Sequence, residues 1–143
     1  MILCCGEALI DMLPRETATG ENAFVPHAGG AVFNTAITLG RLGVDTQFFS
    51  GISNDMFGQV LIDALSASKV DASPAARSDL PTTLAFVKLE NGQASYAFYD
   101  ENTAGRMLDT LPETSANAYF FGGISLAVEP CGKCYEALQQ KVS

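Results

Sequence analysis

A helix flanked by two short apolar runs constrains the fold more than any other part of the sequence. Apolar residues cover most of residues 31–42, as in a helix packed against a core, and Gly43 follows where such a helix would end. Residues 1–6 before the helix and residues 45–52 after it form apolar runs typical of strands covered on both faces. Two strands joined through a helix lie parallel in one sheet, because right-handed crossovers are strongly preferred. The sequence therefore predicts an α/β domain built on a parallel sheet.

Two adjacent glycines, Gly29 and Gly30, lead into this helix. They let the backbone approach a ligand closely, and the first turn of a helix offers free N–H groups to an oxygen-rich partner. Asn34 falls in that turn and brings an amide with one acceptor and two donors. Asp11 interrupts an apolar run at residues 8–13, where an unpaired charge is costly. It either faces a polar cavity or accepts hydrogen bonds from nearby backbone, and its residue type does not decide between the two.

A β-hairpin is predicted at residues 82–100. Asn91-Gly92 is a strong signal for a two-residue turn, and the resulting register places Ala85 opposite Phe98. Both faces of this hairpin are at least partly apolar, so it must cover a site, join a partner, or do both. We expect an extended piece at residues 24–27 to join the hairpin in a small second layer, separate from the parallel sheet.

The remaining elements are simpler to interpret. Asp55 is a good capping residue for a second helix, whose buried face is expected to include Val60. Residues 70–81 have little periodicity and are expected to be connecting structure. Residues 118–121 are interpreted as one more buried strand, and residues 130–142 as an amphipathic helix.

Composition narrows the class of protein. The 143 residues are 48% hydrophobic, as in a globular domain, and carry a net charge of -8, which disfavours nucleic acid and anionic membranes as partners. No apolar run has the length of a signal peptide or a membrane span, so we expect a cytoplasmic protein. Cys131 and Cys134 have the spacing of a redox motif near a helix start, where a thiolate would be stabilised. Reduced structural thiols are the favoured interpretation, because a zinc site would need two more ligands.

Several of these residues together resemble the N-terminal signature of ribokinase or PfkB-type carbohydrate kinases. That signature has a glycine pair, an asparagine four positions on, a helix closed by glycine, and a later Gly-x-x-x-Asp-x-x-Gly run. The matching residues are Gly29, Gly30, Asn34, Gly40, Gly43, Gly51, Asp55 and Gly58. Within the family, the runs from Gly6 to Asp11 and from Phe98 to Ala104 look most like those of bacterial fructokinases.

The resemblance implies a ribokinase-like three-layer α/β sandwich with a largely parallel sheet, plus a small β-sheet lid with strands at about residues 14–28 and 82–100. It also implies transfer of a phosphoryl group from ATP, with Mg²⁺, to a hydroxyl group of a sugar such as fructose. A homodimer formed through the lid hairpin is expected. By motif matching, the residues expected to contact the sugar are Asp11, Gly29, Gly30, Asn34, Phe98 and Tyr99.

Two departures from the family pattern refine these expectations. Asp100 stands where kinases of 2-keto-3-deoxygluconate have an arginine for the substrate carboxylate, which favours a neutral sugar. The family's catalytic aspartate lies in a Gly-Ala-Gly-Asp motif that has no match in residues 1–143. We therefore expect no catalytic residue and no metal ligand here, an incomplete sheet, and a chain that is the inactive N-terminal part of a longer kinase. The alternatives are a kinase of another neutral sugar or of 2-keto-3-deoxygluconate, or a non-catalytic sugar-binding or dimerising fragment.

Overall fold

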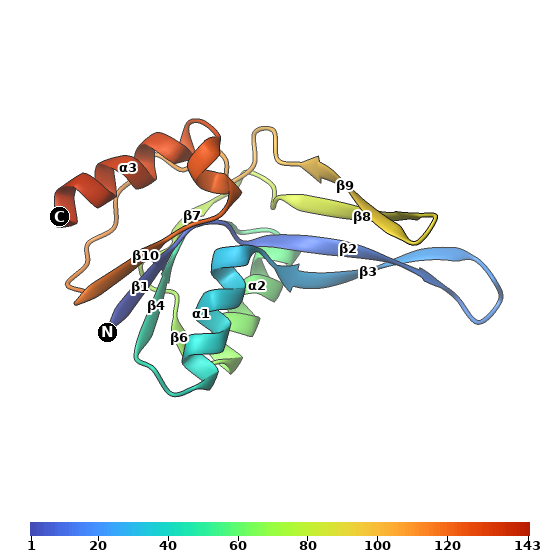
Figure 1. Ribbon diagram of the computed structural model, residues 1–143, viewed down its shortest axis with the longest axis horizontal. Coiled ribbons are helices and arrows are strands. Elements are labelled where there is room, and N and C mark those ends of the chain that lie inside the picture. The colour runs from blue at the N-terminus through green and yellow to red at the C-terminus, as the bar shows by residue number, and fades with distance from the viewer.

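The computed structural model describes residues 1–143 and shows an α/β body from which a second sheet projects (Figure 1). In the body, β1 (Ile2–Cys5) lies between β4 (Thr46–Phe49) and β10 (Ala118–Phe121), and β6 (Val70–Asp71) pairs with the far side of β4. All of these pairs are parallel. The predicted parallel sheet is confirmed, and we call it sheet A.

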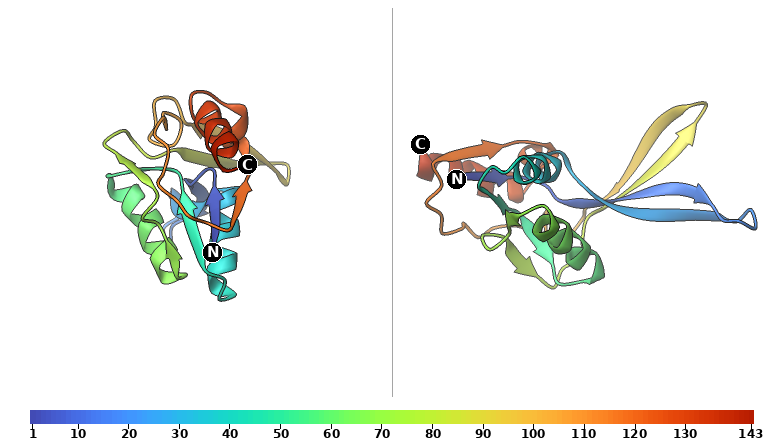
Figure 2. Two further views of the ribbon diagram at one scale, coloured as in Figure 1. Left: turned by 90° about the vertical axis from the view of Figure 1, so that its left-hand side faces the viewer. Right: turned by 90° about the horizontal axis from the view of Figure 1, so that it is seen from below.

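Helices cover both faces of sheet A (Figure 2). On one face, α1 (Ala31–Arg41) and α2 (Met56–Ala67) pack over a core cluster that includes Cys4. On the other face, α3 (Cys131–Val142) packs over a cluster that includes Cys5. The two neighbouring cysteines thus point to opposite faces, as alternation along a strand requires. No helix is both long enough and apolar enough to cross a membrane.

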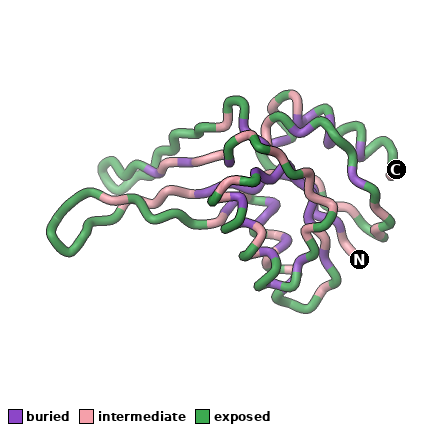
Figure 3. Tube along the Cα trace, turned by 180° about the vertical axis from the view of Figure 1, so that it is seen from behind, coloured by how far each residue is buried: buried purple, intermediate pink, exposed green.

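The projecting sheet, sheet B, has the strand order β3-β2-β8-β9. Its strands are β2 (Leu9–Glu16), β3 (Asn22–Gly29), β8 (Leu84–Glu90) and β9 (Gln93–Tyr99). The two hairpins meet where β2 runs parallel to β8, and both extend away from the body (Figure 2). Figure 3 shows that buried residues concentrate in the body and that the far ends of sheet B are exposed. The predicted second layer is confirmed, although its first segment begins at Leu9 rather than near residue 14.

The predicted hairpin register is also confirmed. Ala85 pairs with Phe98, and Val87 pairs with Tyr96. The turn at Asn91-Gly92 has positive φ angles of 51° and 77°, which is the backbone form that a two-residue hairpin turn requires.

Two predictions about where strands lie are wrong. Residues 45–52 do not form one strand, because the chain leaves sheet A at Ser50 and β5 (Gly51–Ser53) pairs instead with β7 (Ala76–Ser78). A Cβ atom at position 51 would overlap the backbone of Ala104, so this crossing needs glycine. The segment 70–81, expected to be irregular, contains β6 and β7.

Two predictions about burial are also wrong, one for the strand at residues 118–121 and one for Val60 of the second helix. The strand β10 is an edge strand of sheet A rather than a buried one, and its Phe120 side chain is exposed. Val60 of α2 is exposed as well, because Leu61 and Leu65 form the side that packs on the core. The capping role of Asp55 is confirmed, since its carboxylate accepts the N–H of Gly58 at 2.8 Å.

Candidate sugar-binding site

Four of the six predicted site residues meet where sheet B joins the body. They border an open depression of about 300 Å³ to which β2 contributes Asp11 and β9 contributes Phe98. The start of α1 contributes Gly30 and Asn34. The depression therefore collects side chains from three elements that are far apart in sequence.

The carboxylate of Asp11 takes part in none of the hydrogen bonds or ion pairs of the structure and borders the depression. It lies directly over Gly29, where any Cβ atom would overlap the carboxylate. Burial raises the pKa of Asp11, and the facing His27, its cross-strand partner, opposes that effect in part. Of the two interpretations left open by the sequence, the structure favours the polar cavity over backbone hydrogen bonding.

Asn34 presents its side-chain amide to the same depression without a partner in the protein. Only its backbone is engaged: the carbonyl of Asn34 accepts a hydrogen bond from Thr38 Oγ1 at 2.8 Å. An unengaged carboxylate and an unengaged amide in one hollow can together accept from and donate to vicinal hydroxyl groups.

The expectation that α1 offers free N–H groups to a ligand is wrong. Glu7 Oε1 accepts hydrogen bonds from the backbone N–H groups of Ala31 at 3.0 Å and Val32 at 3.4 Å. The carbonyl oxygen of Glu7 accepts the N–H of Phe33 at 3.3 Å. Gly30 has a φ of 110°, and a Cβ atom there would come within 2.7 Å of that same carbonyl oxygen. The position of Glu7 and the positive φ therefore account for a glycine here without any ligand.

Tyr99 does not join the other predicted site residues. Adjacent residues of a strand point to opposite faces, and Tyr99 packs edge-to-face on Phe86, away from Asp11. Tyr96 lines the depression instead and stacks beside Phe98, with 6.1 Å between ring centroids. The predicted register already placed Tyr96 and Phe98 on one face, so alternation along the strand would have indicated which tyrosine lines the depression.

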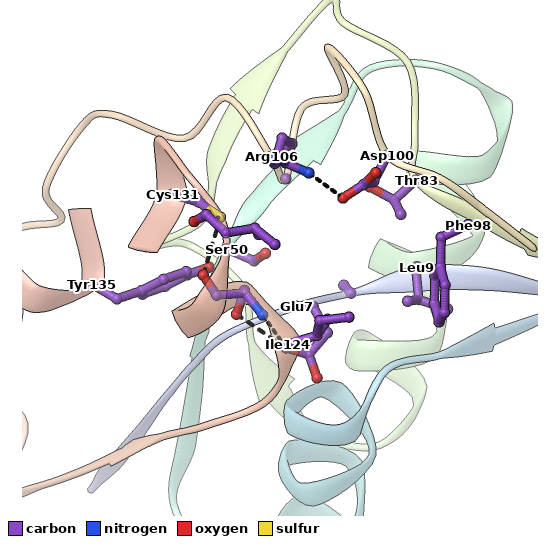
Figure 4. Close-up of a pocket in the computed structure, with 14 residues that line it drawn as sticks. Glu7, Leu9, Ser50, Thr83, Phe98, Asp100, Arg106, Ile124, Cys131 and Tyr135 are labelled. Atoms are coloured by element: carbon purple, nitrogen blue, oxygen red, sulfur yellow. Dashed lines mark hydrogen bonds and ion pairs between the residues drawn. The ribbon is translucent and has the colours of Figure 1, made fainter. Parts of the chain in front are cut away.

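A more enclosed cavity of about 250 Å³ adjoins the depression (Figure 4). The two share a border formed by Glu7, Leu9, Phe98 and Ile124. Ser50 lies at the cavity with its hydroxyl oxygen fully buried and without a hydrogen-bond partner. The cavity therefore has a mostly apolar wall with one unsatisfied hydroxyl group.

Asp100 also lines this cavity, but it is not a lone negative charge. Its Oδ2 atom lies 2.6 Å from Nη1 of Arg106, and both side chains are about one-third exposed. The expectation that Asp100 favours a neutral sugar treated it as an unpaired negative charge, and the ion pair removes that premise. The ion pair presents a nearly neutral end of the cavity.

The structure offers no cluster of side chains for a metal ion, and the N-termini of α1 and α2 are closed to the phosphates of ATP. No group of three or more His, Cys, Asp and Glu side chains could hold a metal ion. Helix N-termini are the usual phosphate cradles, but Glu7 occupies the one on α1 and Asp55 occupies the one on α2. Nucleotide binding therefore requires groups other than these two helix termini.

The cysteine pair on α3 is buried rather than reactive. Burial raises the pKa of both Cys131 and Cys134, which outweighs the expected stabilisation of a thiolate by the helix start. All four cysteines are free thiols. The favoured interpretation as structural thiols agrees with these positions.

Comparisons with known proteins converge on one family. The family model for pfkB family carbohydrate kinases matches residues 1–141. The chain is 63% identical over 142 residues to a fructokinase of Rhizobium leguminosarum bv. trifolii. The aligned region covers 96% of this chain and 44% of that protein. The chain thus spans less than half the length of this curated relative.

Solved structures show the same likeness. A fructokinase from Xylella fastidiosa, which has also been solved with bound ATP, is 39% identical with a TM-score of 0.70 over 75% of this chain and 36% of that one. An uncharacterized sugar kinase from Pyrococcus horikoshii is 29% identical with a TM-score of 0.87, over 99% of this chain and 51% of that one.

Proposed function

Because the chain belongs to the pfkB family of carbohydrate kinases, we propose that it supplies the sugar-binding part and the lid of a kinase that phosphorylates a hydroxyl group of fructose. The choice of site rests on one observation. The carboxylate of Asp11 and the amide of Asn34 both border one depression, and neither makes a hydrogen bond within the protein. Sugars present arrays of hydroxyl groups, which such acceptors and donors bind. Phe98 and Tyr96 supply an apolar wall for the ring.

Sheet B is the proposed lid. It carries Asp11 on β2 and Phe98 on β9, so a movement of this sheet toward the body would close both over a sugar in the depression. Closure excludes water, which would otherwise compete with the sugar hydroxyl as phosphoryl acceptor.

The proposed donor is ATP, with Mg²⁺ as its counter-ion. The family and the ATP-bound fructokinase from Xylella fastidiosa support this donor. Residues 1–143 hold no metal-binding cluster and no Gly-Ala-Gly-Asp motif, and the N-termini of α1 and α2 are occupied. The proposal therefore places the catalytic base, the metal ion and the nucleotide phosphates elsewhere in the kinase.

The test is fructose-dependent formation of ADP by the full polypeptide that carries residues 1–143. Asp11→Asn and Asn34→Ala should each raise the KM for fructose, by about 10- to 100-fold for Asp11, because hydrogen bonds to a charged group contribute roughly 1.5–3 kcal/mol. Asp45→Asn, at an exposed aspartate far from the depression, is the matched control.

Ribose and 2-keto-3-deoxygluconate serve as competing acceptors in the same assay. A preference for either over fructose would replace the proposed substrate but keep the kinase. Unchanged fructose KM values in both site variants would contradict the proposed site.

A further inference from the structure

Glu7 makes an unusual set of contacts for a residue that no motif singled out. It follows β1, lies between the depression and the enclosed cavity, and borders both (Figure 4). One carboxylate oxygen accepts from the N–H groups of Ala31 and Val32 at the start of α1. The other accepts from Ser125, from its N–H at 3.4 Å and its hydroxyl at 3.0 Å. Ser125 belongs to the short helix η1 (Ile124–Ala127), which follows β10.

The backbone on both sides is shaped around this carboxylate. Gly123, just before η1, has a φ of 82°, and any Cβ atom there would overlap the Glu7 carboxylate. Gly30, just before α1, would bring a Cβ atom against the Glu7 carbonyl. A larger residue at either glycine would displace Glu7, so both turns depend on its position.

Electrostatics favour the same arrangement. Unpaired N–H groups at a helix start carry partial positive charge, and a carboxylate beside them is stabilising. Here one carboxylate serves the N–H groups of two separate segments. This joins parts of the chain that are 24 and 118 residues away from Glu7.

The two joined segments form opposite walls of the proposed sugar site. Asn34 lies on α1, one turn after Ala31, and Ile124 of η1 borders both hollows. From this geometry we infer that Glu7 is a positioning residue, which sets the separation of Asn34 and η1 and thereby the shape of the sugar site. This inference rests on the proposed function.

Glu7 acts through its neighbours rather than on the sugar. Each of its carboxylate oxygens already accepts two hydrogen bonds from the protein, so neither is free for a sugar hydroxyl or for its proton. Removal of the Glu7 carboxylate is therefore expected to change binding of the sugar and to leave binding of ATP unchanged.

The kinetic test compares Glu7→Gln with Ser125→Ala in the full polypeptide. Glutamine keeps the size of the side chain and one acceptor oxygen. Its NH₂ group cannot accept a hydrogen bond, so the donors of one of the two segments lose their partner. We expect the fructose KM to rise about 10-fold in Glu7→Gln and about 3-fold in Ser125→Ala, with the KM for ATP unchanged. Glu113→Gln, at an exposed glutamate without hydrogen bonds, is the control and should match the wild type.

The double variant separates positioning from direct contact. If the Ser125 hydroxyl acts through Glu7, its removal has no further effect on KM once Glu7 is glutamine. Multiplying effects in the double variant, or an unchanged fructose KM in a folded Glu7→Gln protein, would overturn the inference. Ser125→Ala and its KM remain informative even if Glu7→Gln does not fold.

Amide hydrogen exchange gives a readout that does not require activity. In Glu7→Gln the amides of residues 31–33 and 124–127 should exchange faster together, because one group protects both segments. A raised KM without faster exchange would indicate direct contact and reject positioning. If the wild type does not phosphorylate fructose, the proposed function fails. The exchange rates of residues 31–33 and 124–127 still test whether Glu7 holds both segments in place.

Discussion

Asp11 is a partly buried carboxylate that takes part in no hydrogen bond or ion pair, and the proposed sugar would supply its missing partner. Burial raises its pKa, which means that the fold disfavours the ionised form. Its contribution to stability is therefore most favourable below the ordinary pKa of an aspartate and declines as pH rises through the value in the fold. An uncompensated carboxylate of this kind is typical of a binding site, where the missing partner is the ligand.

At Asp100 the relevant charge is that of an ion pair with Arg106 rather than that of a lone aspartate. Asp100→Asn would leave Arg106 with an unpaired positive charge at the cavity. We expect the ratio of kcat/KM for 2-keto-3-deoxygluconate to that for fructose to rise about threefold, a modest effect because the pair is partly exposed. Steady-state assays with both acceptors measure this ratio. Glu101→Gln removes a neighbouring exposed carboxylate that has no arginine partner, and an equal shift there would attribute the effect to net charge alone.

Residues that break a local pattern could be predicted, and residues that act across the fold could not. Asp11 stands out because it interrupts an apolar run, and Asn34 because it follows two glycines. Glu7 gives no such signal, since it lies in an ordinary loop and its partners are 24 and 118 residues away. Likewise, the pairing of Asp100 with Arg106 depends on how the loop after β9 turns back.

Among the elements, α2 is connected to the start of the β8–β9 hairpin by a single carboxylate. Asp55 caps α2 and also accepts hydrogen bonds from Thr82, from its N–H at 2.9 Å and its hydroxyl at 2.6 Å. Thr82 lies two residues before β8. A helix cap here also fixes where the hairpin leaves the body.

We expect Asp55→Ala to lower the free energy of unfolding by about 2 kcal/mol at neutral pH, from the lost cap and the bonds to Thr82. Burial alone would raise the pKa of Asp55, but the bonds with Thr82 and Gly58 lower it overall. The contribution is therefore present above the ordinary pKa of an aspartate and is lost as pH falls through the lower value in the fold. Urea unfolding at neutral and at acid pH measures both effects. Asp45→Ala, at an exposed site, should change neither, and a pH-independent loss in Asp55→Ala would contradict the role of its charge.

Elements set by local chemistry were predictable, whereas those set by distant packing were not. Asn91-Gly92 fixes the hairpin register because turn geometry determines which residues face each other. The division of residues 45–52 into β4 and β5 depends on Ala104, which packs against Gly51 from a distant loop. The exposure of β10 depends on its place at the edge of sheet A, which no pattern within four residues reveals.

For the whole molecule, the projection of sheet B exposes two faces that both carry aromatic side chains. The face with Tyr96 and Phe98 turns toward the proposed sugar site. The opposite face carries an aromatic cluster of Phe24, Phe86 and Tyr99, whose ring centroids lie 5.0 Å and 5.5 Å apart. Phe24 and Tyr99 are 47% and 62% exposed, which is costly for large apolar side chains unless another surface covers them.

A second copy of the chain is the proposed partner for this aromatic face, so the protein should sediment as a homodimer. Tyr99→Ser combined with Phe24→Ser should weaken dimer affinity by about 100-fold or more, because two large buried side chains contribute roughly 1.5–3 kcal/mol each. Sedimentation velocity over a range of concentrations measures the shift.

Leu42→Ser is the control: it removes a 75% exposed apolar side chain from the end of α1, on the body, and should leave the dimer intact. A wild-type monomer at all concentrations would reject the dimer. An equal loss in Leu42→Ser would place the interface on the body rather than on sheet B.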